Sequence, residues 1–365
     1  MESFKALGFV GGPCSARSKS SALLSRRAAV KAALALASCA AWRAFGGPAA
    51  PIRVGFLGKG YSHFKDKYAF LKNSPNYQLV GVCEEDASLR RSGPEDVRWL
   101  SRAELFREVE LVVVESGLAE HGPHALAALR AGKHVHVEKP PSALRGEFRA
   151  ILKAAETRKL VLQVGYMWRY NPGFNRAMEA ARQGWLGEVY LVRATMNTLN
   201  GAEARREWAR FPGGAMFEQG SHLIDAVVRL LGVPSRVTPF LKRTGRFGDT
   251  LADNTLAVLE YPRSMALVTS APLQPNAGPQ RFFEILGTQG TAKVGPLEPP
   301  TLSLDLGEAA GPYVKGRQEV PLPTYRRYVD EFDALARSIR EGEPLPVSLQ
   351  REWDIQKTLL SACGM

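Results

Sequence analysis

Residues 52–57, Ile-Arg-Val-Gly-Phe-Leu, lead directly into Gly58-Lys59-Gly60-Tyr61-Ser62-His63. The first six residues form a short apolar run of the length expected for a buried strand. The two glycines permit a tight turn, and they let backbone N–H groups approach a bound group closely. A buried strand that enters such a turn predicts the start of an α/β domain.

Four more apolar runs follow, separated by helix-like segments. They are Gln78–Cys83, Glu110–Glu115, His134–Val137 and Val161–Val164. Strands that alternate with helices favour a parallel, doubly wound sheet, because a helical crossover brings the chain back to start each new strand. We therefore predict an N-terminal Rossmann domain over residues 51–168, in a 365-residue chain that is long enough for two domains.

The glycine turn and a later carboxylate together indicate a dinucleotide. Glu84 lies 24 residues after Gly60, near the interval at which Rossmann domains place a carboxylate on the adenosine ribose. We expect the cofactor to be bound by Gly58, Gly60, Tyr61, Ser62 and Glu84. NAD is favoured over NADP because a carboxylate repels a 2′-phosphate, although Arg90 and Arg91 leave NADP open. A helix-capping role for Glu84 is the structural alternative.

Charge and cysteine content exclude several other classes. The chain holds 48 Lys and Arg against 36 Asp and Glu, a net charge of +12, but half of that excess lies in residues 1–50. The remaining excess is spread without a basic block, which argues against nucleic-acid binding. The four cysteines form no Cys-x-x-Cys pair, so we predict no metal site and no disulfide framework.

The first 50 residues have the pattern of a targeting segment and linker. Ser25-Arg26-Arg27 precedes an apolar stretch, Ala32–Trp42, which is too short to span a bilayer. The pattern resembles a twin-arginine export signal, and Leu36-Ala37-Ser38-Cys39 resembles a lipoprotein cleavage box. We expect a periplasmic or lipid-anchored protein, or a plastid or thylakoid protein in a eukaryote. An Ala/Arg-rich tail with no address is the alternative.

Glu138-Lys139-Pro140 directly follows the strand-like run His134–Val137. This places Lys139 at the carboxyl edge of the sheet, where ligands bind. Here the chain resembles the glucose-fructose oxidoreductase, inositol dehydrogenase and MocA (Gfo/Idh/MocA) family, whose Glu-Lys-Pro motif supplies the active-site lysine. His121, eleven residues before Gly132, matches a histidine of that family. The resemblance implies that Glu138, Lys139 and His121 contact the cofactor. A surface lysine is the alternative.

A second polar cluster lies in residues 213–231. At about 100° per residue, Glu218, His222, Asp225 and Arg229 share one narrow stripe, and the opposite face is apolar. The stripe by itself fits the solvent face of an amphipathic helix. The segment also resembles the family motif Asp-x-Gly-x-His-x-x-Asp, with Glu218 in place of the first Asp. The resemblance implies that His222 and Glu218 are catalytic.

The resemblance extends to the end of the chain. Gly165–Pro172 resembles the family segment that enters the second domain, so we place the boundary near Trp168. Residues 169–365 are then expected to form an α+β substrate domain with a large, mostly antiparallel, open-faced sheet. That domain includes a strand after Asp253 and a helix over Tyr328–Glu341. We expect the chain to form a homo-oligomer through the sheet, and to have no transmembrane span.

The resemblance implies hydride transfer between the nicotinamide ring and a hydroxyl-bearing carbon of a sugar or cyclic polyol. His222 would act as general base or acid, Lys139 would assist through its charge or as a proton relay, and Glu218 would orient the imidazole. Asp225, Arg169 and Tyr170 are expected as substrate or domain-interface contacts. A nicotinamide-assisted glycosidase and a non-catalytic nucleotide-binding protein remain as alternatives.

Overall fold

The structure is a computed structural model that describes residues 50–365. The predicted targeting segment lies outside these residues, so the expected localisation stays a prediction. The predicted boundaries of the two following domains stay predictions as well. Between residues 50 and 365, no helix combines the length and apolar character that a membrane span requires.

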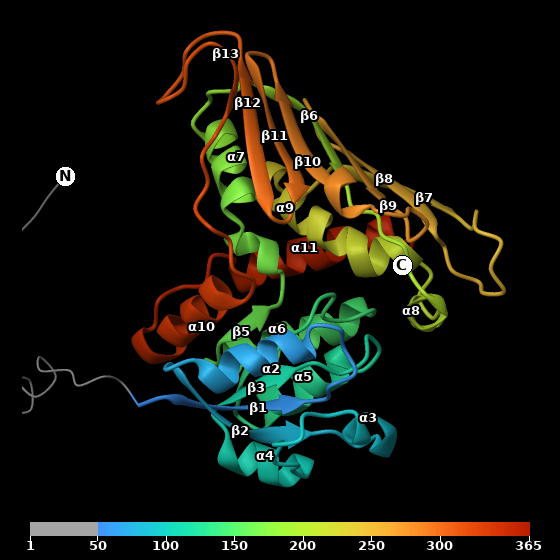
Figure 1. Ribbon diagram of the computed structural model, residues 1–365, viewed down its shortest axis with the longest axis vertical. Helices are drawn as coiled ribbons and strands as arrows, with labels where there is room; N and C mark the ends of the chain where they lie inside the picture. Colours follow the sequence, from blue (N-terminus) through green and yellow to red (C-terminus); the bar gives the residue numbers. More distant parts are fainter. Residues whose placement is uncertain (1–49) are drawn as a thin grey trace, which may run out of the picture. The chain divides into compact units, whose positions relative to one another are not determined.

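The first sheet has five strands, and every neighbouring pair is parallel. Its spatial order is β2-β1-β3-β4-β5. The strands are β1 (Ile52–Leu57), β2 (Tyr77–Cys83), β3 (Leu111–Val114), β4 (His134–Val137) and β5 (Leu162–Val164). The helices between them are α2 (Phe64–Asn73), α3 (Ala87–Arg91), α4 (Arg102–Glu108), α5 (His121–Arg130) and α6 (Arg145–Arg158). This confirms the predicted parallel, Rossmann-like sheet (Figure 1).

The second sheet has eight strands in the order β13-β12-β11-β10-β6-β9-β8-β7. Its strands are β6 (Val189–Thr195), β7 (Arg236–Lys242), β8 (Asn254–Glu260), β9 (Met265–Ser270), β10 (Phe282–Gly287), β11 (Gly290–Leu297), β12 (Pro300–Leu306) and β13 (Gly316–Glu319). Only β6 and β9 pair in parallel within this sheet. The predicted large, mostly antiparallel sheet is therefore confirmed.

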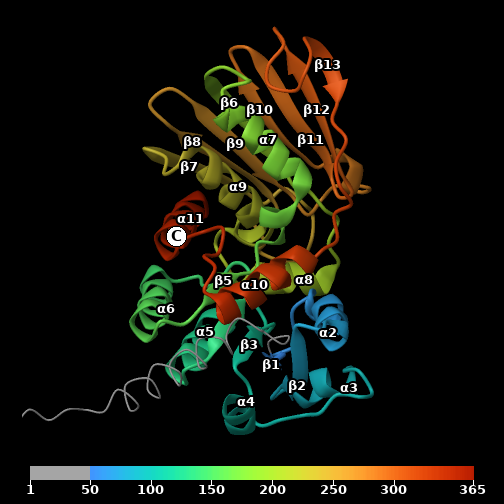
Figure 2. The same ribbon diagram turned by 90° about the vertical axis from the view of Figure 1, so that its left-hand side faces the viewer.

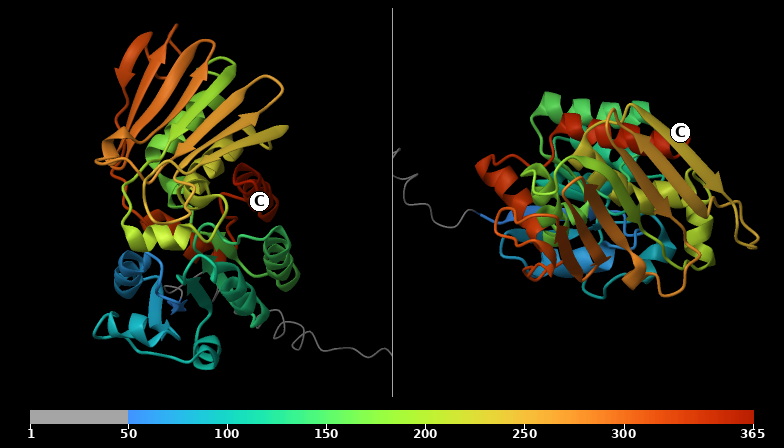
Figure 3. Two further views of the ribbon diagram at one scale, coloured as in Figure 1. Left: turned by 90° about the vertical axis from the view of Figure 1, so that its right-hand side faces the viewer. Right: turned by 90° about the horizontal axis from the view of Figure 1, so that it is seen from above.

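One face of the second sheet is covered by α7 (Pro172–Arg182) and α9 (Ser221–Leu231), which lie in front of the strands in Figure 2. Side chains that point toward these helices, such as Val192, Val268 and Phe283, are buried. The opposite face has no helix over it and faces the viewer in the left panel of Figure 3. Alternation of buried and partly exposed side chains along each strand is expected for a sheet that is packed on one side.

The end of the chain returns to the first sheet. Tyr77 of β2 donates a hydrogen bond to the carbonyl of Phe332 in α10 (Val329–Glu341), with 2.6 Å between the oxygens. Gln163 of β5 donates to the carbonyl of Glu331 at 3.1 Å. The helix α11 (Leu349–Ala362) then lies beside α6 and α9 (Figure 1). The residues predicted as the second domain therefore also help to cover the first sheet.

Candidate active site

The predicted cofactor residues around the glycine turn lie together. Gly58, Gly60 and Glu84 line a cavity of about 450 Å³, together with Ser116 and Gly117. Gly58 has a φ of +83°, and a Cβ atom there would come within 2.5 Å of the Cα of Ser116. Only glycine fits such a conformation and such a close approach without strain. The turn therefore has the shape that a pyrophosphate-binding loop requires.

Glu84 lines this cavity and contacts the backbone of the glycine turn. Its Oε2 accepts a hydrogen bond from the backbone N–H of Lys59 at 2.9 Å, and its Oε1 accepts one from the N–H of Asp86 at 2.9 Å. The carboxylate thus ties the end of β2 to the glycine turn and still borders the cavity. The structure fits the predicted ribose contact, and it gives Glu84 a structural role as well.

A second cavity, of about 430 Å³, shares Gly60 with the first. Tyr61, Ser62, Lys139, Glu218 and His222 all line it. Lys139 and His222, the two residues that the family resemblance implies are in the active site, therefore face one cleft. Lys139 follows the end of β4, Glu218 lies in the segment that leads into α9, and His222 lies in the first turn of α9. The cavity therefore joins residues of both sheets' domains next to the glycine turn.

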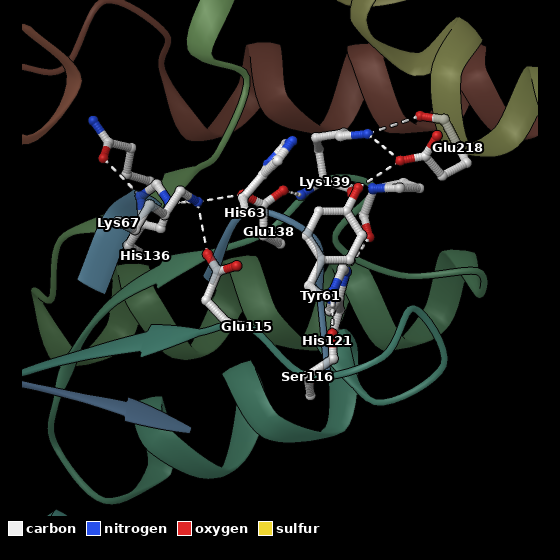
Figure 4. A network of polar contacts seen from close by, with 12 residues as sticks. Tyr61, His63, Lys67, Glu115, Ser116, His121, His136, Glu138, Lys139 and Glu218 are labelled. Carbon is white, nitrogen blue, oxygen red and sulfur yellow. Dashed lines mark hydrogen bonds and ion pairs between the residues drawn. The ribbon is translucent and has the colours of Figure 1, made fainter. Parts of the chain in front are cut away.

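Lys139, Glu218 and Tyr61 form one hydrogen-bonded group at this cavity (Figure 4). The Lys139 ammonium donates to Oε1 of Glu218 at 2.5 Å and to the Glu218 carbonyl at 3.2 Å. The Tyr61 hydroxyl donates to the same Oε1 at 2.6 Å. Burial, together with the Glu218 carboxylate, raises the pKa of Tyr61 well above its ordinary value, so its proton stays on oxygen. Tyr61 is therefore a hydrogen-bond donor in this group.

The predicted pairing of Glu218 with the imidazole of His222 is wrong. Among residues 50–365 no hydrogen bond joins them, and the buried Nδ1 of His222 has no partner. A carboxylate binds an ammonium and a hydroxyl more strongly than a neutral imidazole, because the ammonium supplies a full charge. Glu218 therefore orients Lys139.

Aromatic rings hold the imidazole of His222 instead. The ring centroid of Trp168 lies 4.7 Å from that of His222, and Tyr166 meets it edge-on at 5.7 Å. Burial, followed by the nearby Lys139 ammonium, lowers the pKa of His222 well below its ordinary value. The imidazole is therefore neutral at neutral pH and can accept a proton from a group in the cavity.

The backbone before His222 departs from the single α-helix that periodicity indicates. Met216–Gly220 forms a π-helical turn, and α9 begins at Ser221. A π turn contains one more residue than an α turn, so it shifts the phase of every side chain that follows it. The four residues of the predicted stripe thus do not share one environment, and Asp225 points elsewhere than Glu218.

Asp225, Arg169 and Tyr170, which were predicted as substrate or domain-interface contacts, do not line this second cavity. Arg169 donates to Asp225 at 2.8 Å and to two oxygens of Glu352 at 2.5 and 2.8 Å. These side chains are buried, so the charges compensate one another and leave no group free for a ligand. Tyr170 accepts a hydrogen bond from Gln163 at 3.1 Å. The alternative expectation, contacts between the domains, fits this cluster.

His121 and Glu138 are also placed behind the cavity walls rather than on them. His121 is fully buried, with Nδ1 2.9 Å from the Pro140 carbonyl and Nε2 3.0 Å from the Ser116 carbonyl. Its ring packs edge-on against Tyr61 at 5.2 Å. Neither residue lines either cavity, and their predicted contacts with the cofactor stay a prediction. His121 instead braces Tyr61 and the loop that carries Lys139.

Glu138 belongs to a buried network whose centre is Lys67 of α2 (Figure 4). The Lys67 ammonium donates one hydrogen bond each to Glu138, to Glu115 at 2.7 Å and to Nε2 of His136 at 2.9 Å. All three of its hydrogens therefore have an acceptor. Burial alone lowers the pKa of Lys67, but the carboxylates of Glu115 and Glu138 outweigh it and raise the pKa above its ordinary value.

The same three acceptors have the geometry of a metal site. The ligand atoms of Glu115, His136 and Glu138 lie within 4.8 Å of one another. The Lys67 ammonium bonds to all three, so it takes the place that a cation would have. His136 donates through Nδ1 to Gln163 at 2.9 Å, which leaves Nε2 as an acceptor, and burial lowers its pKa to about 3. The histidine is therefore neutral.

Sequence reasoning missed three kinds of residue here. His63 lies three residues after Gly60, where the Gly-x-Gly-x-x-Gly motif of Rossmann domains has its third glycine. Its side chain lies on the cavity wall, with Nδ1 2.9 Å from Oε1 of Glu138. Lys67 follows it by one helical turn, and that spacing of His63 and Lys67 was the available signal. Two arginines, Arg281 and Arg327, also line the cavity. They lie far from every recognised motif, so no local pattern indicates them.

We expect the Lys67→Met substitution to lower the free energy of unfolding by about 3–5 kcal/mol, because it removes the buried ammonium that compensates the charge of Glu138 in the interior. Lys72→Met on the same helix is the matched control, since the Lys72–Asp96 pair is about half exposed. Removal of such a surface pair costs about 0–1 kcal/mol. Denaturant unfolding of both variants checks this, and equal losses would contradict a central role for Lys67.

Two sequence models of one family match this chain. The model described as "Oxidoreductase family, NAD-binding Rossmann fold" matches residues 52–166, and the "GFO/IDH/MocA C-terminal domain" matches residues 174–293. The first model covers the glycine turn, Glu84 and Lys139, and the second covers Glu218 and His222. The two matches thus include the first cavity and most of the residues that line the second.

Individual proteins agree with the family models. The scyllo-inositol 2-dehydrogenase (NADP(+)) IolW of Bacillus subtilis is 25% identical, over 85% of this chain and 92% of that protein. The D-xylose 1-dehydrogenase (NADP(+)) 2 of Haloferax volcanii is 28% identical, over 66% and 72%. The solved structure of GenD2 from gentamicin A biosynthesis, in complex with NAD, has a TM-score of 0.71 at 24% identity, over 87% and 94%. The chain belongs to the Gfo/Idh/MocA family of oxidoreductases, with its NAD-binding Rossmann domain first and its family C-terminal domain after it.

Proposed function

We propose that this oxidoreductase transfers a hydride between a nicotinamide cofactor and a hydroxyl-bearing carbon of a sugar or cyclic polyol. One observation carries the proposal: Lys139, Glu218 and His222 line a single cavity that shares Gly60 with the cavity of the glycine turn. A proton acceptor and a cation thus face the place where a cofactor and a hydroxyl group would meet.

Oxidation of a hydroxyl group requires removal of its proton while the hydride leaves the carbon. When bound, the cofactor supplies the hydride acceptor. His222 is neutral at neutral pH because its pKa is lowered, so it takes the hydroxyl proton. The Lys139 ammonium stabilises the negative charge that develops on the oxygen. Glu218 positions that ammonium by accepting its hydrogen bond through Oε1, and Tyr61 holds Glu218 in place by donating to the same oxygen.

The names of the relatives support the substrate class. One relative acts on scyllo-inositol and another on D-xylose, a cyclic polyol and a sugar. The cavity itself fits hydroxyl-rich ligands, because hydrogen-bonding side chains such as Asn200 and Gln219 line it.

Glu84 supports NAD as the preferred cofactor, because its carboxylate borders the first cavity and would repel a 2′-phosphate. Arg90 and Arg91 do not line that cavity, but Arg102 does. Its guanidinium pairs with Glu85 at 2.8 Å, which reduces its attraction for a phosphate. The two curated relatives described above use NADP, so the choice is one of the outcomes of the following test.

Denaturation of the purified full-length protein should release a nicotinamide nucleotide, and mass spectrometry would identify it as NAD. A panel of sugars and cyclic polyols should then give reduced cofactor, followed by absorbance. Cleavage of a glycoside with no net change in cofactor would instead support the nicotinamide-assisted glycosidase. Retained nucleotide with no reaction on any sugar or glycoside would support the binding protein.

We expect Lys139→Ala and His222→Ala each to lower kcat by roughly 100-fold or more, because each removes a group that acts as the transition state develops. Calorimetry should show that NAD affinity changes little in both variants. Lys153→Ala, on the exposed side of α6, is the control and should keep full activity. If either active-site variant keeps kcat within a few-fold of the natural protein, that residue has no part in the chemical step.

The pH dependence of oxidation follows from the lowered pKa of His222. A lowered pKa keeps the imidazole neutral to lower pH, so kcat/KM should stay constant through about pH 6.5 and fall only below it. Burial raises the pKa of Glu331 to about 7, and Glu331→Gln removes that titration from the profile. An acidic limb at or above about pH 6.5 that persists in Glu331→Gln would contradict a neutral His222.

The uncovered face of the second sheet supports the predicted assembly with a second copy of the chain. Leu256, Leu267 and Leu286 point to that face and are only partly buried, and Met265 is 49% exposed. An apolar face of this kind favours contact with another protein surface. Light scattering of the full chain should give a multiple of the chain mass of 39.9 kDa, and the mass of a single chain would exclude this assembly.

A further inference from the structure

The wall of the active-site cavity carries two guanidinium groups, Arg281 and Arg327, that the proposed reaction does not use. We propose that the substrate is an acidic sugar or polyol whose carboxylate or phosphate group binds Arg281, with Arg327 beside it. This inference rests on the proposed function, because it adds an anionic group to the same substrate.

Arg281 is held in place but has no counter-ion. It lies between the 3₁₀ turn Gly278–Gln280 and β10, and its Nε donates to the carbonyl of Asn197 at 2.7 Å. Within residues 50–365, no carboxylate oxygen lies within 4.0 Å of its guanidinium nitrogens, and its two terminal nitrogens donate no hydrogen bond. The residue is partly buried, and this burial lowers its pKa. A fixed, partly desolvated cation with free donors is suited to bind an anion.

Arg327 is itself a cation, and it forms an ion pair with Glu298, the carboxylate that lies near Arg281. Its Nε donates to Oε2 of Glu298 at 2.7 Å. The other oxygen of Glu298 accepts a hydrogen bond from the indole of Trp168 at 2.6 Å. Glu298 raises the pKa of Arg281 and Arg327 lowers it, so the two arginines share one nearby carboxylate. That part of the wall therefore keeps an uncompensated positive charge.

The other carboxylates of the cavity are occupied or distant. Glu218 binds Lys139 and Tyr61. Glu207 of α8 (Ala202–Trp208) accepts from the backbone N–H of Leu118 at 3.0 Å, and Glu203 lies on the exposed side of the same helix. None of the three forms an ion pair with Arg281.

The charge lies near the reacting groups. Arg327 is among the charges that lower the pKa of His222, and Glu218 is among those that raise the pKa of Arg281. A neutral polyol would leave the terminal nitrogens of Arg281 to water. A carboxylate or phosphate would instead accept two parallel hydrogen bonds from them, because the guanidinium fork matches the spacing of these oxygens.

The test uses the full-length protein loaded with NAD and series of sugars that share one ring. Each series holds the neutral sugar, its uronate and its 6-phosphate, for example glucose, glucuronate and glucose 6-phosphate, with galactose and mannose series beside it. We expect at least one anionic member to exceed its neutral counterpart in kcat/KM by about tenfold or more. Preference for the uronate or for the phosphate identifies which anion the site takes.

Arg281→Gln should reduce that preference to about twofold or less, and Arg281→Lys should retain part of it, because lysine keeps the charge but not the fork. Arg326→Gln is the matched control, since Arg326 is exposed, adjoins Arg327 and does not line the cavity. It should leave the preference unchanged.

Calorimetric titration of the same compounds separates failure of this inference from failure of the proposed function. If no sugar reduces the cofactor, the proposed oxidation is wrong, but tighter binding of an anionic member that Arg281→Gln abolishes still supports the anion site. Equal or tighter binding of the neutral member in every series would overturn the inference. So would an anionic preference that survives in Arg281→Gln, or the absence of binding by every compound.

Discussion

The ammonium group of Lys67, buried among Glu115, His136 and Glu138, is the interaction on which the site depends. It joins helix α2, which follows the glycine turn, to β4 and to the residues just after β3 and β4, two neighbouring strands of the first sheet. Glu138 uses its other oxygen to accept the backbone N–H of Lys139 at 3.0 Å. The charge of one buried lysine thus fixes the backbone from which the active-site lysine projects. An interior ion of this kind is stable only while every partner is present.

Two further ion clusters continue this arrangement across the cavity. Lys139 and Glu218 connect the first sheet's edge with the π turn before α9, and Arg169 connects the start of the second domain with Asp225 and Glu352. The side chains of all three clusters are almost fully buried, so each cluster holds one geometry more firmly than a surface pair would. The cavity is consequently bordered by fixed charges, which suits a reaction that creates charge on a single oxygen.

Local sequence patterns predicted the parallel strands and the glycine turn, because strand alternation and φ-positive glycine act over a few residues. The strand pattern placed Lys139 at the carboxyl edge of the sheet, and the catalytic role of His222 came from the family resemblance. The partner of Glu218 could not be predicted, since periodicity assumes a regular helix and does not reveal the π turn at Met216–Gly220. Lys67 was missed because a lysine within a helix is usually exposed. Arg169, Asp225 and Glu352 meet only through long-range packing, which no local pattern records.

The π turn also has a consequence for sequence evolution. Its five residues, Met216–Gly220, lie between Gly214 and His222. Deletion of one residue there would restore a regular α-helix. Every later residue of α9 would then rotate by about 100° relative to Gly214, so that a neighbour of His222 would face the cavity. The number of residues between Gly214 and His222 therefore decides which side chain faces the cavity. Homologous chains could exchange most side chains of this segment, but a change of length by one residue would alter the chemistry they can perform.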